Sequence, residues 1–399
     1  MKKILLITNY FHFKSEKESN RYRELAMIIS KENDIELEVI TSRFYQRTKT
    51  FRDKLDELKK EVPYKVTFID EIGYSKSISF KRLRTSHIFG KNVIKYLKTQ
   101  KKPDVIYQVV PTLDVAKSVC KYANKNKIPL IIDIQDLWPE AFKMAFNIPI
   151  LSDLVFLPIM SKANYIYSHA DRICAVSKTY VDRALSVNKK CKYGEAVYIG
   201  INLNKFDENI KNNLFDWNDS KLRLAYCGSL DKSYDIKLVI DALSLVKNPP
   251  VFVVIGDGEL KNEFESYAAS KRVNAEFLGY VPYEKMCGII ASCDMVINPI
   301  IGSSVATIIN KHGDYAASGL PVLNTQNSKE YIEIVDNYKM GLNSPSGNVE
   351  ALAKNIDFLV NNELERKQMG RNARRCAEEL FDRMSTYGKL VNVIKSCLE

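Results

Sequence analysis

The order of elements in residues 105–134, VIYQVVPTLDVAKSVCKYANKNKIPLIIDI, indicates how this chain folds. Two short runs rich in β-branched residues, 105–109 and 130–134, have the composition of buried strands, and the longer segment between them has a helical pattern. Strand, helix and strand in this order predict a parallel sheet that is covered by helices.

The same alternation extends in both directions along the chain. In the first half, the predicted strands are 4–8, 36–41, 65–69, 105–109, 130–134 and 172–176. In the second half they are 222–227, 251–255, 275–278, 295–297 and 321–324, and the predicted helices include 235–246 and 283–292. We therefore expect an α/β protein with two Rossmann-like, doubly wound domains. Such domains bind ligands beyond the carboxyl ends of their strands, so we expect the chemistry in a cleft between the two.

The length of 399 residues also favours two domains, because one domain usually comprises about 100 to 200 residues. Residues 202–221 contain six Asn, a composition that favours turns. We predict a linker at 207–221, between an N-terminal domain at 1–206 and a C-terminal domain at 222–380. Residues 381–399 are predicted to form a helix that crosses back to the N-terminal domain.

The composition excludes several classes of protein. With 46% hydrophobic residues, 16 Gly and 13 Pro, the chain is neither collagen-like nor disordered. Its eight Cys contain no C-x-x-C pair and do not group with the four His, which disfavours a zinc site and a disulfide framework. The first apolar run is too short for a signal peptide, and no run is long enough to span a bilayer. We expect a cytoplasmic protein with reduced thiols.

Positive charge is concentrated in the first half of the chain. Residues 1–200 contain 36 Lys and Arg against 22 Asp and Glu, or +14, whereas residues 201–399 contain 23 against 26, or −3. Within 72–103 there are nine basic residues and no acidic one. The apolar members of this segment have near-helical spacing: Phe80, Leu83, His87, Ile88, Ile94 and Leu97. We predict a helix with one buried and one cationic face, which can meet anionic lipid headgroups, plain solvent or nucleic acid, although no nucleic-acid motif accompanies it.

Two glycine motifs follow predicted strands of the second half. In YCGSL at 226–230, a glycine at the strand end precedes small polar residues and then Lys232, which lets the backbone approach an anion such as phosphate. A tight turn between strand and helix accounts for this motif equally well. The pair of glycines in GDGE at 256–259 lacks the third Gly and the ribose-binding acid of a dinucleotide fingerprint, so a nicotinamide-dependent oxidoreductase is poorly supported.

The most informative stretch is NKHGDYAASGLPV at 310–322, which predicts a short helix that runs into a strand. Asp314 can accept hydrogen bonds from ribose hydroxyls, and Lys311, one turn earlier, can neutralise a diphosphate. The alternative is a capped surface helix that stops at Gly319.

Together these motifs resemble those of the retaining, metal-independent glycosyltransferases of family four. The resemblance rests on ADRICAVS at 170–177, GIN at 200–202, VIGDGEL at 254–260, FLGYVP at 277–282 and the 310–322 segment, and it covers most of the chain. It implies the GT-B fold, a nucleotide-sugar donor, and neither a metal nor another cofactor. The segment DLWPE at 136–140 is similar to the subgroup that builds capsule, lipopolysaccharide or exopolysaccharide repeat units on lipid carriers.

The resemblance also implies a set of site residues. The donor site is expected to comprise Gly228, Ser229, Lys232, Gly256, Tyr280, Val281, Gly302, Ser303, Ser304 and Asp314, and the catalytic candidates are Gln135, Asp136 and Lys311. The acceptor is expected at Trp138 and at His12 in the polar loop 9–20. Plainer interpretations stay open, with Asp136 as a helix cap, Trp138 as a packing anchor and His12 as a solvated surface residue.

The sequence departs from the family pattern at several positions. Gln135 replaces a His of the family, and the polar loop 9–20 replaces a Gly-Gly turn after the first strand. Two further departures concern the donor site. The family has two Glu separated by seven residues; the second corresponds to Asp314 and the first to Ala306, which has no carboxylate to place beside the transferred sugar. A diphosphate-binding Arg of the family corresponds to Ser229, so the phosphate charge is expected to fall on Lys232 and Lys311. Either backbone N–H groups of the 302–305 loop substitute for the missing carboxylate, or the protein is catalytically impaired.

The expected activity is transfer of a sugar, with retention of configuration, from a nucleoside diphosphate sugar such as a UDP-N-acetylhexosamine to a lipid-linked saccharide in bacterial surface polysaccharide synthesis. The protein is expected to rest on the anionic inner face of the cell membrane, alongside possible partner glycosyltransferases, and not to bind nucleic acid. Two alternatives stay open. One is a GT-B-like binding subunit that has lost catalysis and supports a partner glycosyltransferase, and the other is a nucleotide-sugar epimerase.

Overall fold

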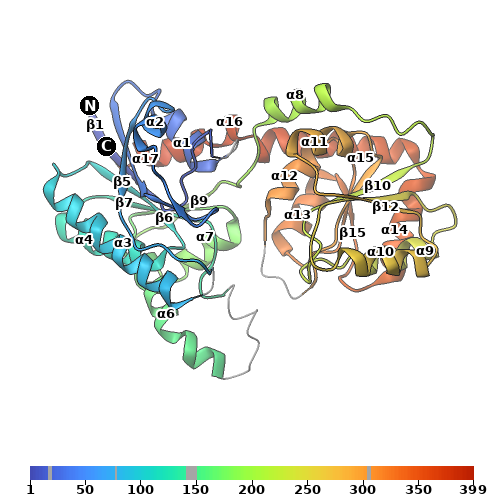
Figure 1. Ribbon diagram of the computed structural model, residues 1–399, viewed down its shortest axis with the longest axis horizontal. Helices are drawn as coiled ribbons and strands as arrows, with labels where there is room; N and C mark the ends of the chain where they lie inside the picture. The colour runs from blue at the N-terminus through green and yellow to red at the C-terminus, as the bar shows by residue number, and fades with distance from the viewer. Residues whose placement is uncertain (17–19, 77–78, 141–150, 303–306) are drawn as a thin grey trace. The chain divides into compact units, whose positions relative to one another are not determined.

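The computed structural model describes residues 1–16, 20–76, 79–140, 151–302 and 307–399. The chain divides into two compact units, and each is built on one parallel sheet (Figure 1). The N-terminal unit comprises Met1–Tyr198 and Tyr387–Glu399, and the C-terminal unit comprises Ile199–Thr386. The predicted fold class, two α/β domains with parallel sheets, is confirmed.

The sheet of the N-terminal unit has seven parallel strands in the order β5-β2-β1-β6-β7-β8-β9. Their bounds are β1 Lys2–Ile7, β2 Ile35–Ser42, β5 Lys65–Ile69, β6 Val105–Val110, β7 Leu130–Ile134, β8 Arg172–Ala175 and β9 Gly194–Ala196. A short antiparallel pair follows β2 and consists of β3 Phe44–Tyr45 and β4 Thr50–Phe51. The strand order reverses between β1 and β6, which pair with Leu6 opposite Tyr107. Doubly wound sheets bind ligands at such a reversal.

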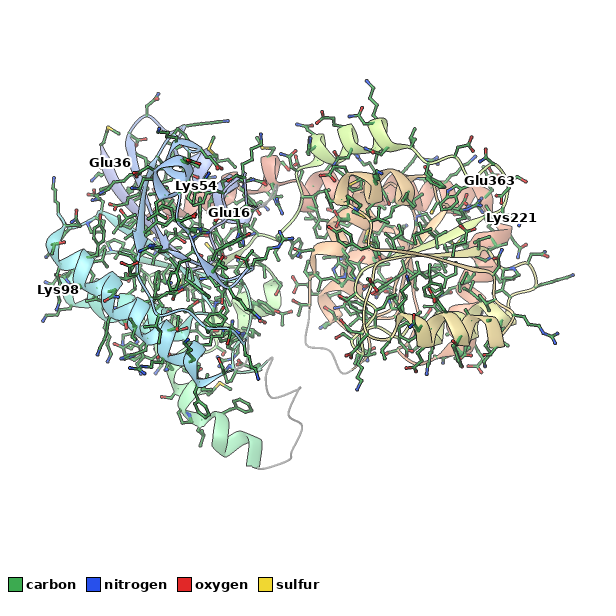
Figure 2. All side chains as sticks on the ribbon, in the orientation of Figure 1. Glu16, Glu36, Lys54, Lys98, Lys221 and Glu363 are labelled. Carbon is green, nitrogen blue, oxygen red and sulfur yellow. The ribbon has the colours of Figure 1, made fainter. Side chains whose placement is uncertain are left out.

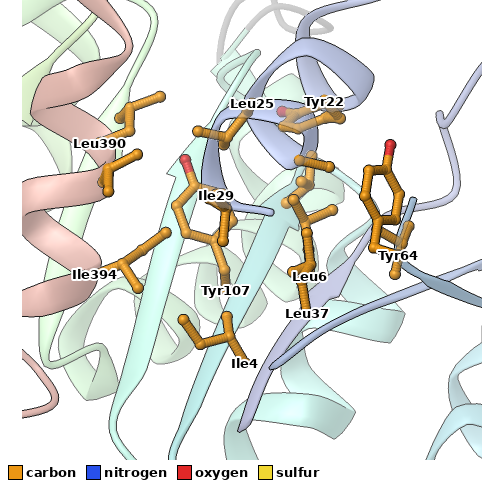
Figure 3. Close-up of a cluster of buried hydrophobic side chains, with 14 of the residues drawn as sticks. Ile4, Leu6, Tyr22, Leu25, Ile29, Leu37, Tyr64, Tyr107, Leu390 and Ile394 are labelled. Atoms are coloured by element: carbon orange, nitrogen blue, oxygen red, sulfur yellow. The ribbon is translucent and has the colours of Figure 1, made fainter. Parts of the chain in front are cut away.

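Helices cover both faces of this sheet. They are α1 Arg21–Ile29, α2 Leu55–Lys60, α3 Phe80–Thr99, α4 Leu113–Asn126, α6 Leu151–His169, α7 Lys178–Leu185 and, from the end of the chain, α17 Gly388–Lys395. On one face α4 packs against both α3 and α6, whereas α1 and α17 pack together on the other (Figure 1). Buried side chains of β1, β6, α1 and α17 join in one apolar cluster that includes Leu6, Tyr107, Leu25 and Ile394 (Figure 3).

Helix α1 shows how the sequence produces this arrangement. The Asn20 side chain accepts a hydrogen bond from the N–H of Arg23 and thereby caps the start of the helix. Leu25, Ala26 and Ile29 then recur on one face and are buried. Burial of a Leu or Ile side chain contributes about 1.5–3 kcal/mol, so packing against the sheet, rather than intrinsic propensity, stabilises this short helix.

The sheet of the C-terminal unit has six parallel strands in the order β12-β11-β10-β13-β14-β15. The strands are β10 Arg223–Cys227, β11 Val251–Ile255, β12 Ala275–Gly279, β13 Met295–Asn298, β14 Val322–Asn324 and β15 Gly341–Asn343. The helices are α8 Leu203–Asn213, α9 Ile236–Leu245, α10 Lys261–Ser270, α11 Tyr283–Ala291, α12 Asn310–Ala317, α13 Lys329–Tyr338, α14 Val349–Asn361, α15 Glu363–Cys376 and α16 Arg383–Thr386. One π-helical turn, Ala377–Phe381, separates α15 from α16.

Two boundary predictions were wrong. The predicted linker 207–221 overlaps α8, which begins at Leu203, is capped by the Asn202 side chain and belongs to the C-terminal unit. Leu203, Phe206 and Asn209 are buried on the face of α8 that packs against α11, so this partner overrides the turn-forming Asn residues. The predicted helix 381–399 is instead divided into the two short helices α16 and α17. Its expected return to the N-terminal unit does occur, because α17 belongs to that unit.

The basic segment forms the predicted helix α3, but its buried face differs from the predicted one. Thr85, Phe89, Gly90, Val93 and Leu97 are buried against the N-terminal unit. Phe80 is 91% exposed and Leu83 is 56% exposed, although both were predicted to be buried. The register of the helix is decided by contact with α4, which the spacing of apolar residues does not reveal.

Charged side chains lie on the surfaces of both units. The cysteines form no disulfide bonds. Figure 2 shows charged side chains such as Lys98, Lys221 and Glu363 extending outward from their units. All eight Cys are free thiols, and most of them are buried. Over the described ranges, no helix combines the length and apolarity needed to cross a bilayer.

Candidate functional site

The C-terminal sheet reverses its strand order between β10 and β13. The connections that follow these two strands therefore leave the same edge of the sheet in opposite directions. Backbone hydrogen bonds join the connections, because the Asp235 N–H donates to the Pro299 carbonyl at 2.7 Å and the Ile301 N–H donates to the Ser233 carbonyl at 3.2 Å. The two loops form one continuous surface at the position where open α/β sheets bind ligands.

Three glycines occupy the ends of adjacent strands on this edge. Gly228 follows β10, Gly256 follows β11 and Gly279 ends β12, with φ angles of 153°, 146° and 68°. A Cβ atom on Gly256 would overlap the Gly228 carbonyl, and one on Gly228 would overlap the Lys311 ammonium group. Glycine is therefore required at 228 so that a cation can lie directly against the backbone, next to the exposed Ser229.

Lys311 brings its positive charge to this strand end from α12. Its Nζ donates a hydrogen bond to Tyr226 Oη at 3.1 Å and lies 4.5 Å from the centre of the Tyr226 ring. The same Nζ lies 3.5 Å from the centre of the Tyr234 ring. Burial lowers the pKa of Lys311 to about 7. The site therefore holds a lysine that gains or loses its proton near neutral pH.

Helix α12 is anchored beside β10 by two of its aromatic residues. The Cys227 N–H, at the end of β10, donates to Tyr315 Oη at 2.9 Å. The His312 ring stacks in parallel on Tyr331 with 3.5 Å between ring centres, and its Nε2 lies 3.2 Å from the Asn298 amide. Burial lowers the pKa of His312 well below its usual value, so this residue is neutral and structural. These contacts fix the residues that α12 presents to the strand ends.

Asp314 lies one turn beyond Lys311 on α12. The Tyr283 hydroxyl, from the first residue of α11, donates to Asp314 Oδ1 at 2.8 Å. Burial raises the pKa of Asp314 to about 6, although the Tyr283 hydrogen bond and the charges of Arg383 and Lys311 act in the opposite direction. At neutral pH this carboxylate is ionised and has a free capacity to accept hydrogen bonds from hydroxyl groups.

The other predicted donor residues have different surroundings. Lys232 is exposed, in contrast to the enclosed Lys311. Tyr280, which is 78% exposed, and Val281 connect β12 to α11 and so lie close in sequence to Tyr283. Gly302 is exposed beyond β13. Ser303 and Ser304, as well as Ala306, lie outside the described residues. Within the described ranges, no three His, Cys, Asp or Glu side chains come together as a metal site.

In the N-terminal unit, Gln135 and Asp136 follow β7. Gln135 Nε2 donates to Oδ1 of the buried Asp133 at 3.2 Å, and Asp133 also accepts a hydrogen bond from Tyr107 at 2.8 Å. The side chain of Gln135 is therefore tied to a buried polar network. Asp136 Oδ2 accepts a hydrogen bond from Trp138 Nε1 at 3.0 Å, and burial raises the pKa of Asp136.

Trp138 belongs to a cluster that we call the arginine–aromatic cluster, consisting of Tyr10, Tyr74, Arg82 and Trp138. The Arg82 guanidinium carbon lies 5.3 Å from the Trp138 ring centre and 5.7 Å from the Tyr74 ring centre. Arg82 Nη2 also donates to Tyr10 Oη at 3.2 Å. Tyr10, Tyr74 and Trp138 follow β1, β5 and β7, so the cluster lies at the carboxyl end of the N-terminal sheet.

His12 lies beside Tyr45, in the loop that follows β1. Its ring packs edge-on against Tyr45, with 5.4 Å between ring centres. The loop around it is fixed by the buried Arg52, which donates to Glu16 at 2.6 and 2.8 Å and to the Phe11 carbonyl at 2.7 Å. His12 is therefore held in an ordered loop, not in a freely solvated one.

A buried carboxyl group lies near the arginine–aromatic cluster. Glu71 accepts a hydrogen bond from Ser42 Oγ at 2.7 Å, and its charge acts on Tyr74. Burial raises the pKa of Glu71 to about 7. This side chain can exchange a proton near neutral pH, and the sequence analysis did not identify it.

Reasoning from the sequence missed several residues of these two sites: Tyr226, Tyr234, Tyr283, Arg82 and Glu71. The tyrosines resemble ordinary core or surface aromatics when only their spacing is known. Arg82 was visible as one of nine charges in the basic segment, but nothing distinguished it from the others. A signal did exist for Tyr226, because it begins the YCGSL motif, two residues before Gly228.

Comparisons with known proteins agree with this arrangement. Residues 207–376 match the model of a family described as glycosyl transferases group 1. An uncharacterized glycosyltransferase of Methanocaldococcus jannaschii is 25% identical over 228 residues, which are 56% of this chain and 60% of that protein. The chain thus spans somewhat less than two thirds of the length of this curated relative.

Solved structures share the fold over nearly the whole chain. HepE of Anabaena, solved in complex with UDP, has a TM-score of 0.67 and 15% identity, and the match covers 99% of this chain and 100% of that one. The lipopolysaccharide outer core galactosyltransferase WaaB has a TM-score of 0.64 and 14% identity, with 99% of each chain covered. These matches identify the fold as GT-B, as the sequence predicted.

Proposed function

We propose that this protein, whose residues 207–376 match the model of the group 1 glycosyl transferases, transfers a sugar from a nucleoside diphosphate sugar to a lipid-linked saccharide. The transfer retains the configuration of the sugar. We assign the reaction to the synthesis of a bacterial surface polysaccharide. The UDP complex of HepE supports the donor class. The likeness to WaaB, a lipopolysaccharide outer core galactosyltransferase, supports the acceptor class.

The observation that carries this function is the position of Lys311 against Gly228, at the strand reversal of the C-terminal sheet. A diphosphate that approaches the half-buried Gly228 and the exposed Ser229 meets the Lys311 nitrogen, a donor that suits its negative charge. Asp314 is within one helical turn and accepts hydrogen bonds, which suits it to ribose hydroxyls. We assign the nucleobase to the exposed strand end at Tyr280 and Val281.

The chemical task of this site is to stabilise a leaving group. When the bond between the sugar and the diphosphate breaks, its electron pair stays with the diphosphate oxygen, where negative charge accumulates. The Lys311 ammonium and the backbone N–H groups of the strand-end loops can stabilise that charge, and one such donor is typically worth about 3 kcal/mol. This assignment uses residues of the chain alone and includes no metal or other cofactor.

We assign the acceptor to the arginine–aromatic cluster, together with Asp136. Three aromatic rings offer apolar faces against which sugar rings can pack, and a guanidinium group between them suits a phosphate of a lipid carrier. The raised pKa of Asp136 indicates a carboxyl group that is enclosed enough to take part in proton transfer.

We propose that the first turns of α3 contact an anionic membrane surface. Phe80 and Leu83 are exposed there, and Lys81 and Arg84, between and beside them, are exposed as well. Apolar side chains flanked by cations are typical of surfaces that enter the headgroup layer, where each Lys or Arg contributes about 1 kcal/mol. This contact brings the enzyme to a lipid-linked acceptor.

A panel of nucleotide sugars, scored by thermal shift and by release of the nucleoside diphosphate, tests the function. We expect one donor to stabilise the protein by about 2.7 kcal/mol at a concentration of 100 Kd. Lys311→Ala is expected to lower the rate of release about 100-fold, because it removes a leaving-group donor. Asp314→Ala is expected to weaken donor binding. Lys285→Ala, at an exposed position of α11, serves as the matched control and should match the parent.

The outcomes separate the proposed enzyme from the alternative. If nucleotides bind but no donor is turned over with any lipid-linked acceptor, the protein is a binding subunit without catalysis, and Ala306 accounts for the loss. If no nucleotide binds at all, the transferase function is wrong. Turnover that survives both substitutions would place the donor elsewhere.

A further inference from the structure

Lys311 is enclosed by two aromatic rings that come from different segments. Tyr226 belongs to β10, whereas Tyr234 lies in the connection between β10 and α9. Their ring centres are 5.6 Å apart with a 61° angle between the planes, and the Lys311 Nζ lies 4.5 Å from one centre and 3.5 Å from the other. We call this pair the tyrosine cage. It holds the nitrogen against the backbone of Gly228.

The hydrogen bonds inside the cage accept either protonation state of the lysine. The Tyr226 hydroxyl donates its one proton to the Ser229 carbonyl at 2.7 Å, so its oxygen presents a lone pair to Lys311 at 3.1 Å. An ammonium group and a neutral amine both carry an N–H that can use this lone pair. Losing the proton therefore does not release the side chain from its place.

The charged and titratable groups around Lys311 come from three segments. Asp231 lies in the loop after β10 and Asp314 is on α12, and both favour the charged lysine. Cys227 ends β10, and burial raises the pKa of its thiol to about 12, so it is neutral near pH 7. Among the described residues, none of these carboxylates forms an ion pair with Lys311, and the neighbouring His312 is neutral. The enclosure outweighs their attraction, and the pKa of Lys311 is lowered to about 7.

We propose that Lys311 takes up a proton when the donor diphosphate binds, and that Tyr234 is the positioning residue on which this coupling depends. The inference rests on the proposed function, since it requires a nucleoside diphosphate at Gly228 and Ser229. The bound phosphate oxygens add negative charge to that of Asp231 and Asp314, which stabilises the ammonium form. The charge that later stabilises the leaving group is thus acquired with the donor.

Tyr234 has this role because of its ring rather than its hydroxyl. The ring covers one side of the nitrogen at 3.5 Å, where it keeps water away from the amine and attracts the cation once it forms. Tyr234→Phe keeps this face. Tyr234→Ala opens the cage to water, which hydrates the ammonium and lets Lys311 stay charged before the donor arrives.

Calorimetric titration with UDP, repeated in buffers of different ionisation enthalpy, counts the protons bound with the nucleotide. For a lysine with a pKa of about 7, the parent should take up about 0.9 proton per UDP at pH 8 and about 0.1 at pH 6, relative to Lys311→Met. Tyr234→Phe should match the parent. Tyr234→Ala should take up less than half as much at pH 8 while still binding UDP.

Each result has a distinct meaning. If UDP binds but the parent and Lys311→Met take up equal numbers of protons at pH 8, the coupling is overturned and the proposed function stands. Full uptake in Tyr234→Ala overturns the role of Tyr234 alone. A circular dichroism spectrum equal to that of the parent shows that Tyr234→Ala folds. Tyr234→Phe, which keeps the ring and loses only the hydroxyl, is the conservative control for the proton uptake. If neither UDP nor any other nucleoside diphosphate binds the parent, both the inference and the proposed function are overturned.

Discussion

At the scale of single residues, the proposed donor site combines an acid and a base whose pKa values have moved toward each other. Burial raises the pKa of Asp314 to about 6 and lowers that of Lys311 to about 7. Asp314 is charged at neutral pH, whereas Lys311 is divided between its two forms. Each residue favours its neutral form more than it would in water, and a bound nucleotide can reverse this for the lysine.

The pH dependence of donor binding should reveal the charge of Asp314. Its carboxylate accepts hydrogen bonds more strongly when ionised, and it becomes protonated as the pH falls through about 6. Asp314→Asn should therefore weaken UDP binding about tenfold at pH 8 but hardly at all at pH 5, where the parent is itself neutral. Measured dissociation constants from pH 5 to 8 give this ratio, and dividing by the variant cancels the titration of Lys311. A ratio that does not change with pH would contradict the role of the carboxylate charge.

At the scale of elements, helix α3 has one face that packs onto the N-terminal unit and first turns that expose apolar side chains. Phe89, Val93 and Leu97 pack it onto the N-terminal unit, while its first turns expose Phe80 and Leu83. Arg82, in the same turns, extends to the arginine–aromatic cluster. A membrane contact at these turns and an acceptor site at Arg82 would therefore be joined by one rigid element.

Flotation with vesicles that contain phosphatidylglycerol tests the membrane contact of α3. The double substitution Phe80→Ser and Leu83→Ser should lower the partition coefficient of the protein onto the vesicles about 100-fold. Each apolar side chain contributes about 1.5 kcal/mol when it leaves water. Leu364→Ser is the matched control, since Leu364 on α15 is 83% exposed without being on α3. If the α3 variant and the Leu364→Ser control lose vesicle binding equally, this surface is ruled out. The same holds if the parent protein does not bind anionic vesicles.

At the scale of the whole molecule, the two ends of the chain share one core. Tyr387, Leu390, Val391 and Ile394 are buried in the same apolar cluster as β1 and α1 of the N-terminal unit (Figure 3). The N-terminal unit is therefore completed by residues that follow the entire C-terminal unit in sequence.

Substitution of Leu390 should destabilise the N-terminal unit. Leu390→Ala removes a fully buried side chain, and such changes cost about 2–5 kcal/mol. Lys389→Ala, at the exposed neighbouring position, should leave stability within about 0.5 kcal/mol of the parent. Urea unfolding monitored by hydrogen exchange distinguishes the units. Loss of protection in β1 and β6 is expected, and loss confined to β10 and β11 would show that α17 belongs to another core.

The sequence by itself determined the parallel sheets, because each buried strand is a short apolar run that is visible locally. Strands 65–69, 130–134 and 251–255 were predicted with the bounds they have. The bounds of helix α8 and of the two helices α16 and α17 were not predicted correctly, because contacts with distant segments determine where these helices form. Of the residues that the motifs predicted for a donor site, Gly228, Lys311 and Asp314 lie together around the end of β10. Only the tertiary structure decided that Tyr226 and Tyr234 enclose Lys311, because the contacts of its nitrogen with the two rings join segments about 80 residues apart. No spacing along the chain encodes such a contact.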